Sequence, residues 1–267
     1  MMIFFDQLNR RLELKKTPQR IVSLVPSQTE LLVDLGLEDR IVGVTKFCVH
    51  PRDLRKKKEL VGGTKQVDPE KIAKLAPDII LCNKEENTPE MVEELQQIAP
   101  VHVSDIKTID DSLELIREYG MIFGAKEKAS EIVGKILDEK TAFLEFIAER
   151  PQKKAAYFIW KNPWMVVAED TFIDHLLALN NFSNVFAGSK SRYPEVRPEE
   201  LQKLEPDLVL LSTEPFPFKE DDKEELRKLV RKDCIRIVDG EYFSWYGSRL
   251  IEAFEYFRKL HAELAAS

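Results

Sequence analysis

A chain of 267 residues is longer than one average domain, so one large domain or two of moderate size are expected. Hydrophobic residues make up 43% and charged residues 33%, the balance of a globular protein with enough apolar material for a core. The net charge of −7 argues against nucleic acid as a partner, because phosphate binding needs a concentrated positive surface.

Membrane and disulfide signals are weak. No stretch approaches the roughly 20 apolar residues of a membrane span, and residues 1–16 lack the apolar segment and cleavage site of a signal peptide. The cytoplasm is therefore one expected location, and the cell envelope after removal of a leader is the other. Cys48, Cys82 and Cys234 lack metal-type spacing, and their odd number predicts no disulfide framework.

The first predicted elements form a strand–helix–strand unit. Residues 20–26 are a short β-branched run typical of a buried strand. Ser27 and Glu30 have capping-box spacing, and the helix they predict runs to Leu35 before Gly36. A second strand is expected at residues 41–44, and a unit of this size implies a parallel pair.

Alternation continues through the first half. Asp68 is a good N-cap and Pro69 suits the first helical position. This helix must end before Pro77, where a strand begins at once. A further helix is expected at residues 88–99 and a strand at 101–103.

The middle of the chain is helix-forming. Residues 109–149 are broken only around Gly120 and Gly124, and a helix over 125–149 would be about 37 Å long. The second half then alternates again, with strands expected at 155–159, 165–167, 208–211 and 235–238 and helices at 173–179 and 248–265.

An internal repeat organises this pattern. Residues 196–210 echo residues 67–81, so that Glu199 matches Glu70 at an offset of 129 positions. Both segments have a Pro-Glu helix start followed by Pro-Asp and an apolar strand. The predicted fold is α/β, with two Rossmann-like lobes with parallel sheets (residues 1–124 and 151–267) joined by one long backbone helix (125–150). The cleft between the lobes is the expected ligand site.

These motifs resemble the helical-backbone class of solute-binding proteins of ABC importers, over residues 20–264. The carriers of the resemblance are the segments 21–30, 62–64, 68–70 and 75–78. The resemblance implies a non-enzymatic binding protein, a membrane permease as partner and a bulky ligand such as cobalamin, a ferric siderophore or haem. It is most similar to the cobalamin-binding branch.

Two positions depart from the cobalamin-binding branch. An aromatic residue that stacks on the ligand in that branch corresponds here to Thr64, and the tyrosine-rich loop corresponds to residues 47–51, Phe-Cys-Val-His-Pro. A different corrinoid pose or a different ligand is therefore open.

Glu70 and Glu199 are the candidate permease-docking residues, since the family's docking glutamates occupy such helix starts. The alternative is that each only interacts with its helix dipole.

The candidate ligand-binding residues are aromatic side chains, one histidine and one arginine, in loops that follow strands or precede the last helix. They are Phe47, His50, Trp160, Trp164, Trp245, Tyr246 and Arg249. Core packing is the alternative for the tryptophans, and surface packing for the histidine.

No catalytic residue, resident cofactor or metal site is predicted. No G-x-S-x-G, P-loop or G-x-G-x-x-G motif is present, and Cys48 with His50 lacks the third group of a catalytic arrangement. The expected function is an ABC-importer binding protein for cobalamin or a related corrinoid, acting as a monomer. The alternatives are haem or ferric-siderophore binding by the same fold, or a cytosolic corrinoid-handling or sensing protein without a transporter.

Overall fold

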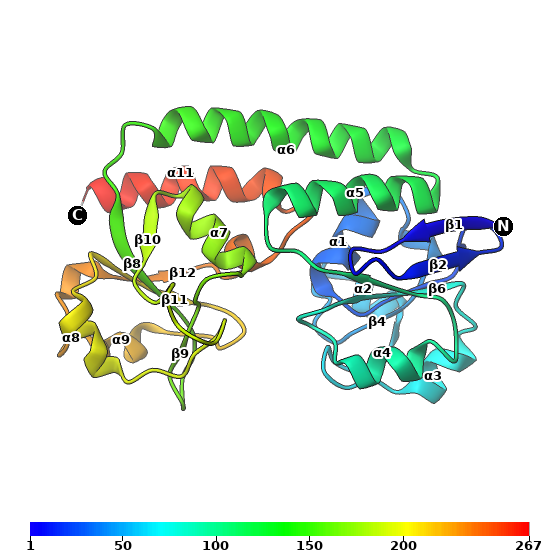
Figure 1. Cartoon of the computed structure of the whole chain (residues 1–267), viewed down its shortest axis with the longest axis horizontal. Coiled ribbons are helices and arrows are strands. Elements are labelled where there is room, and N and C mark those ends of the chain that lie inside the picture. Colours follow the sequence, from blue (N-terminus) through cyan, green and yellow to red (C-terminus); the bar gives the residue numbers. More distant parts are fainter. Residues whose placement is uncertain (267) are drawn as a thin grey trace. The chain divides into compact units, whose positions relative to one another are not determined.

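The computed structural model of the protein describes residues 1–266, without the side chain of Lys232. The chain forms two compact units (Figure 1). Unit 1 contains residues 1–106, 110–137 and 245–250, and unit 2 contains residues 107–109, 138–244 and the chain from Ile251 onward. In the described part of the chain, no helix has both the length and the apolar character needed to span a membrane.

Unit 1 is built on a five-stranded parallel sheet. Its strands, in spatial order, are β5 (Glu59–Leu60), β4 (Ile41–Val44), β3 (Ile21–Ser23), β6 (Ile79–Asn83) and β7 (Val101–Ser104). The helices of the unit are α1 (Pro26–Asp34), the 3-10 helix η1 (Glu38–Arg40), α2 (Leu54–Lys57), α3 (Pro69–Lys74), α4 (Pro89–Leu95) and α5 (Ile109–Phe123), whose first residue lies in unit 2. In Figure 1, α3 and α4 lie on one side of this sheet and α5 on the other.

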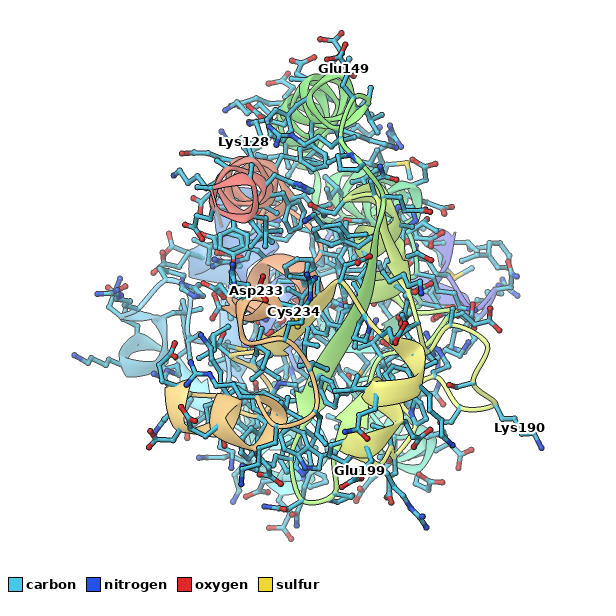
Figure 2. The ribbon with its side chains drawn as sticks, turned by 90° about the vertical axis from the view of Figure 1, so that its left-hand side faces the viewer. Lys128, Glu149, Lys190, Glu199, Asp233 and Cys234 are labelled. Carbon is cyan, nitrogen blue, oxygen red and sulfur yellow. The ribbon has the colours of Figure 1, made fainter. Side chains whose placement is uncertain are left out.

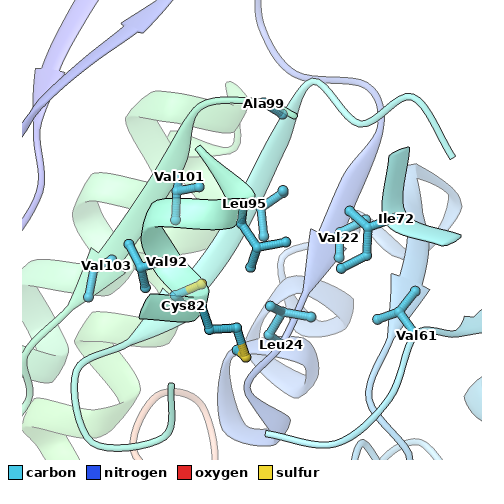
Figure 3. Close-up of a cluster of buried hydrophobic side chains, with 12 residues drawn as sticks. Val22, Leu24, Val61, Ile72, Cys82, Val92, Leu95, Ala99, Val101 and Val103 are labelled. Carbon is cyan, nitrogen blue, oxygen red and sulfur yellow. The ribbon is translucent and has the colours of Figure 1, made fainter. Parts of the chain in front are cut away.

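One hydrophobic core cluster of unit 1 lies between the sheet and helices α3 and α4 (Figure 3). Val22, Ile80 and Val101 face Ile72 and Leu95 across this layer, and all five are at most 5% exposed. Burial of this apolar surface is the main favourable contribution to folding, at about 25 cal/mol per Å². Strands that are buried in this way read as continuous apolar runs, which is how they were predicted.

A hairpin of β1 (Met2–Phe5) and β2 (Arg11–Leu14) covers the edge strand β7. Its turn uses side chains rather than strand pairing: Asp6 accepts a hydrogen bond from the Val103 N–H at 3.0 Å, and Arg10 donates one to the Val101 carbonyl at 2.8 Å. Backbone groups of β7 that an open sheet edge would leave without partners are thereby hydrogen-bonded. This hairpin was not among the predicted elements.

Unit 2 has a sheet with the order β10-β8-β11-β12, and β9 pairs antiparallel with β8. The strands are β8 (Lys153–Trp160), β9 (Met165–Val166), β10 (Phe182–Asn184), β11 (Leu208–Ser212) and β12 (Ile235–Val238). The helices are α7 (Phe172–Leu179), η2 (Pro198–Glu200), α8 (Leu201–Leu204), α9 (Glu220–Leu226), η3 (Lys232–Cys234), α10 (Glu241–Ser244) and α11 (Leu250–Ala265), whose first residue lies in unit 1.

The two units share one plan. In each, the first strand of the sheet (β3 or β8) is flanked by the next parallel strand (β4 or β10) on one side, and by the strand that follows the Pro-Glu segment (β6 or β11) on the other. The residues before the matched prolines, Ala76 and Glu205, both have a positive φ, of 43° and 46°. The repeat found in the sequence is therefore also a repeat of backbone conformation. The predicted α/β fold with two parallel sheets is confirmed, except that β9 joins the sheet of unit 2 in antiparallel direction.

Helix α6 (Lys126–Ile147) connects the units, with residues up to Leu137 in unit 1 and residues from Asp138 in unit 2. It is close to the helix expected over residues 125–149. A second segment, Trp245–Leu250, comes from the last part of the chain but belongs to unit 1. We call it the 245–250 segment.

Two local predictions were wrong. Helix α1 begins at Pro26 with Val25 at its N-cap and no side-chain cap, so Ser27 lies inside the helix, Glu30 bonds to Arg249, and the predicted capping box does not form. Helix α4 ends at Leu95 rather than Ala99, because the N–H groups of Gln97 and Ile98 bond three residues back in a tightened last turn.

Candidate functional site

The candidate site of unit 1 lies at the carboxyl edge of its parallel sheet, where ligands of open α/β sheets are bound. His50 follows β4, and its ring meets the ring of Trp245 edge-on at a centroid distance of 5.4 Å. The guanidinium of Arg249 lies over the Trp245 ring, 5.0 Å from its centre. Three of the predicted ligand residues, 199 positions apart at their extremes, are therefore in one group.

Arg249 is held by a carboxylate. Its Nε donates to Glu30 Oε2 at 2.8 Å and its Nη2 to Oε1 at 2.5 Å, a two-point pair in which the side chains are 7% and 16% exposed. Burial raises the pKa of Glu30 above its usual value, although the hydrogen bonds and charge of Arg249 and the nearby His50 oppose this effect. The arginine is therefore oriented by Glu30 before any ligand arrives.

Tyr246 lies in a buried polar network. The Gln28 amide donates to the Tyr246 hydroxyl at 2.9 Å and to Ser104 Oγ at 2.7 Å, and its oxygen accepts from Tyr119 at 2.7 Å. Burial raises the pKa of both tyrosines, so that they are neutral hydroxyl groups at physiological pH. Because Ser104 ends β7, this network fixes the 245–250 segment at the carboxyl edge of the sheet.

The loop after β4 exposes one aromatic ring. Phe47 is 48% exposed, with the Lys46 ammonium 5.0 Å from its ring centre. Cys48 is fully buried beside the hydroxyls of Thr29 and Thr45, and burial raises the pKa of its thiol. A buried neutral thiol is a packing group, not a nucleophile.

The loop after β6 was not predicted as part of the site. Asn83 ends β6, and its side-chain oxygen accepts from the N–H groups of Glu85 and Glu86 at 2.8 and 3.2 Å. Burial raises the pKa of the Glu86 carboxyl, although the charge of Lys65 opposes this effect. An Asn at the end of a buried strand is a typical signal for such an Asx turn.

In unit 2, an aromatic cluster lies at the carboxyl end of β8. Trp160 is 40% exposed and meets Phe216 at 5.6 Å, whereas Trp164 is 7% exposed and stacks on Phe218 at 5.7 Å. Lys161 lies 5.2 Å from the Trp164 ring and pairs with Asp222 at 2.9 Å. Trp164 is thus part of the unit 2 core, and Trp160 is the ring available at the surface.

The seven predicted ligand residues therefore fall into two sets. Unit 1 holds Phe47, His50, Trp245, Tyr246 and Arg249, and unit 2 holds Trp160 and Trp164. Whether the two sets face one ligand stays a prediction. Sequence reasoning did not find Glu30, Gln28, Ser104, Glu86 or Phe216.

The matched glutamates are both exposed. Glu70 lies in the first turn of α3, after an N-cap in which Asp68 accepts from the Lys71 N–H at 2.9 Å. Glu199 lies in η2, directly before α8, at the surface of unit 2 (Figure 2).

Among residues 1–266, no group of three or more His, Cys, Asp or Glu side chains is arranged to hold a metal ion. The unit 1 edge offers aromatic contact, an imidazole and a paired guanidinium, and the unit 2 edge offers aromatic contact. Aromatic faces with few polar groups are typical of sites for large, partly planar molecules.

Two α/β units of one plan, joined by a long helix and carrying aromatic groups at their carboxyl edges, define a two-lobed solute-binding protein. Residues 21–235 match the family model described as "Periplasmic binding protein". The chain belongs to this family, and the resemblance to the helical-backbone class is confirmed.

Two curated relatives show how far the similarity extends. The chain is 26% identical over 261 residues to an uncharacterized ABC transporter substrate-binding lipoprotein, YvrC, of Bacillus subtilis, covering 94% of this chain and 82% of the relative. It is 26% identical over 199 residues to the vitamin B12-binding protein of Vibrio cholerae, covering 73% and 70% of the two chains.

Solved structures show the same fold. The periplasmic vitamin B12 binding protein BtuF of Vibrio cholerae has a TM-score of 0.79 at 22% identity, covering 92% of this chain and 98% of that one. A periplasmic heme binding protein from Pseudomonas aeruginosa has a TM-score of 0.80 at 21% identity, covering 91% and 92%.

Proposed function

We propose that this protein binds cobalamin or a related corrinoid and delivers it to the permease of an ABC importer. The observation that carries the proposal is the group formed by His50, Trp245 and Arg249 at the carboxyl edge of the unit 1 sheet. The names of two curated relatives support it, one as an ABC transporter substrate-binding lipoprotein and one as a vitamin B12-binding protein.

The physical basis is the match between ligand and side chains. A corrinoid has a broad, largely apolar macrocycle, which aromatic rings hold by stacking and edge contacts. Among the candidate ligand residues, Phe47 and Trp160 have exposed rings, at 48% and 40%, and each supplies such a surface in its own unit. The His50 imidazole is a nitrogen ligand for cobalt when it is neutral.

Catalysis is not part of the proposal. Cys48, the thiol nearest in sequence to His50, is buried with a raised pKa, and the His50 ring packs on Trp245. The side chains at this edge therefore support binding without a chemical step.

Haem is the second candidate, favoured by one observation. His50 is partly exposed, and an imidazole is a common axial ligand of haem iron. Haem carries two propionates, so its binding needs a cation that is not already paired. Because Arg249 is bonded to Glu30, this group favours a corrinoid over haem.

Intrinsic fluorescence tests the proposal, because the chain has only three tryptophans. Cyanocobalamin, cobinamide, haem and a ferric siderophore are titrated into the protein, with calorimetry in parallel. We expect cyanocobalamin or cobinamide to quench the emission with the highest affinity.

A variant that keeps only Trp245 (Trp160→Phe with Trp164→Phe) should still be quenched, whereas Trp245→Phe should bind more weakly. Tighter binding of haem than of either corrinoid would replace the proposal with the haem alternative, and no binding by calorimetry would contradict both.

Glu70 and Glu199 are proposed as the residues that meet the permease, one from each unit. Both carboxylates are exposed at the starts of matched helical segments, which supports this assignment.

A further inference from the structure

Glu30 has an unusual position for a residue of the local motif Ser-Gln-Thr-Glu. It is the fifth residue of α1, yet its carboxylate makes no cap and instead forms both hydrogen bonds to Arg249, which is 219 positions away in the sequence. Arg249 in turn lies over Trp245, and Trp245 meets His50. The Glu30 carboxylate is thus linked, through Arg249, to the Trp245 ring at the candidate site.

The 245–250 segment is fixed to unit 1 at two further points. Gln28 bonds to the Tyr246 hydroxyl at 2.9 Å, and the Gly247 N–H donates to Ser112 Oγ at 2.9 Å. These contacts hold the backbone of the segment, but neither touches the Trp245 ring. Arg249 lies over the ring, 5.0 Å from its centre, and the two-point bond to Glu30 sets the direction of its guanidinium.

We propose that Glu30 is a positioning residue of the ligand site, which acts by holding the Arg249 guanidinium against the Trp245 ring. A guanidinium over an indole is an attractive contact when both groups are shielded from water, and these side chains are 7–8% exposed. The ring is therefore oriented before the ligand binds, and less of the binding energy is spent on ordering it. The effect of Glu30 on ligand binding rests on the proposed function, whereas its effect on the Trp245 ring does not.

The first test uses the ligand-free protein, with Trp245 as the only tryptophan (Trp160→Phe with Trp164→Phe). We expect Glu30→Gln to shift the Trp245 emission and to increase its quenching by acrylamide, because the indole loses its fixed neighbour. The matched control is Glu131→Gln, which removes an exposed glutamate paired with Lys128 and Lys135 on α6 of the same unit and should change neither signal. Unchanged emission and quenching in Glu30→Gln would overturn the proposal.

A pH titration of the protein that keeps Trp245 as its only tryptophan supplies a second test, in which Glu30 itself is unchanged. The charged groups that face Glu30 are Arg249, His50 and Asp34. Protonation of Glu30 releases Arg249, and since its pKa lies above the usual 4.5, acrylamide quenching of Trp245 should rise as the pH falls toward that value from above. This change should persist in His50→Gln and disappear in Glu30→Gln. A titration that follows His50 instead would overturn the assignment.

The ligand arm uses cyanocobalamin as the probe. Glu30→Gln should weaken its binding by roughly threefold to thirtyfold, the span of a shielded cation–π contact, with the thermal midpoint measured alongside. Glu30→Asp, which keeps the charge, should recover part of the loss. If the parent protein does not bind cyanocobalamin, the proposed function fails while the fluorescence result still decides the role of Glu30. If binding in Glu30→Gln is unchanged, the positioning role fails while the proposed function stands.

Discussion

Asp78 and Asp207, which are 129 positions apart, perform the same task in the two units. Asp78 Oδ2 accepts from the backbone N–H groups of Gln19 and Arg20 at 2.8 and 3.0 Å, just before β3. Asp207 Oδ2 accepts from the N–H of Lys154 at 2.8 Å, in β8. Each carboxylate ties the strand that follows it to the first strand of its own sheet.

Replacement of these residues should destabilise the protein unequally. Asp78→Ala should lower the free energy of unfolding by about 1–3 kcal/mol, because two backbone N–H groups lose a charged acceptor. Asp207→Ala should have a smaller effect, since one N–H is involved. Urea denaturation measures both, with the exposed Asp39→Ala as the control. An equal or larger loss in Asp207→Ala would contradict this reasoning.

The contribution of Asp78 should depend on pH. Burial acts to raise its pKa, but the N–H groups of Gln19 and Arg20 and the charge of Lys16 hold it below the usual 3.8. A depressed pKa gives stability that is complete above the pKa of the unfolded chain and is lost as pH falls through the folded value. The difference between the wild type and Asp78→Ala should therefore shrink below about pH 4.

Asp6 should matter more than its place near the N-terminus suggests. It is 3% exposed, pairs with Arg10 and accepts from the N–H of Val103 in the edge strand β7. Asp6→Ala leaves the partly exposed Arg10 without its carboxylate and the Val103 N–H without its acceptor, so a loss of about 1–3 kcal/mol is expected.

Hydrogen exchange gives the local readout of this effect. In Asp6→Ala, the Val103 amide should exchange faster than the amides of the central strand β3. The control is Glu13→Gln, which breaks an exposed pair with Arg11 on the same hairpin and should leave Val103 unchanged. Equal acceleration across the whole sheet would indicate global destabilisation instead of opening of the edge.

The strands and the duplicated plan could be predicted from the sequence because their signals are local. The bounds of β4 and β12 agree with prediction to the residue, since each is a short β-branched run between turn signals. The hairpin β1–β2 was missed because its turn is stabilised by Val101 and Val103, about 90 residues away. No local pattern carries that information.

The candidate site shows the same difference between local sequence signals and contacts of distant residues. His50, Trp245 and Arg249 could be proposed because loops at the carboxyl edge of parallel strands and aromatic residues are recognisable in sequence. The structure places the three side chains together, and their contact with a ligand stays a prediction. Glu30 was interpreted as part of a capping box, because the Ser27–Glu30 spacing suits one. Its true partner is separated by 219 positions, so only the folded chain reveals it.

His261 should make unit 2 sensitive to mild acid. It is 4% exposed, stacks on Phe182 at 5.0 Å and lies 3.2 Å from the Asn180 side-chain oxygen. Burial, with the charges of Arg150 and Lys153, lowers its pKa from 6.5 to about 4, against a hydrogen bond at Asn180 that acts the other way. The unfolded chain then binds a proton between these pH values and the folded chain does not.

The sign of the effect follows from that difference. Stability is complete above about pH 6.5 and falls as the pH drops to about 4, by at most about 3 kcal/mol. His261→Gln should flatten the dependence of the thermal midpoint on pH in this window, whereas His175→Gln on α7 should keep it. A wild-type midpoint that does not change between pH 6.5 and 4 would contradict the assignment.

Glu70 and Glu199 should affect the permease and not the ligand. Their carboxylates are exposed and start matched helical segments, one in each unit, so their removal opens no cavity and breaks no core contact. If they meet arginines of the permease, the double variant Glu70→Ala with Glu199→Ala should bind the permease more weakly and with less dependence on salt. Binding is measured with the permease in detergent at low and physiological ionic strength, and cyanocobalamin affinity is measured alongside and should not change.

The matched control is Glu90→Ala, because Glu90 also follows a proline in the first turn of an exposed helix start, on α4 of unit 1, but lies outside the repeat. Equal weakening by Glu90→Ala would show that general negative charge attracts the permease, and unchanged permease binding by the double variant would remove both residues from the interface.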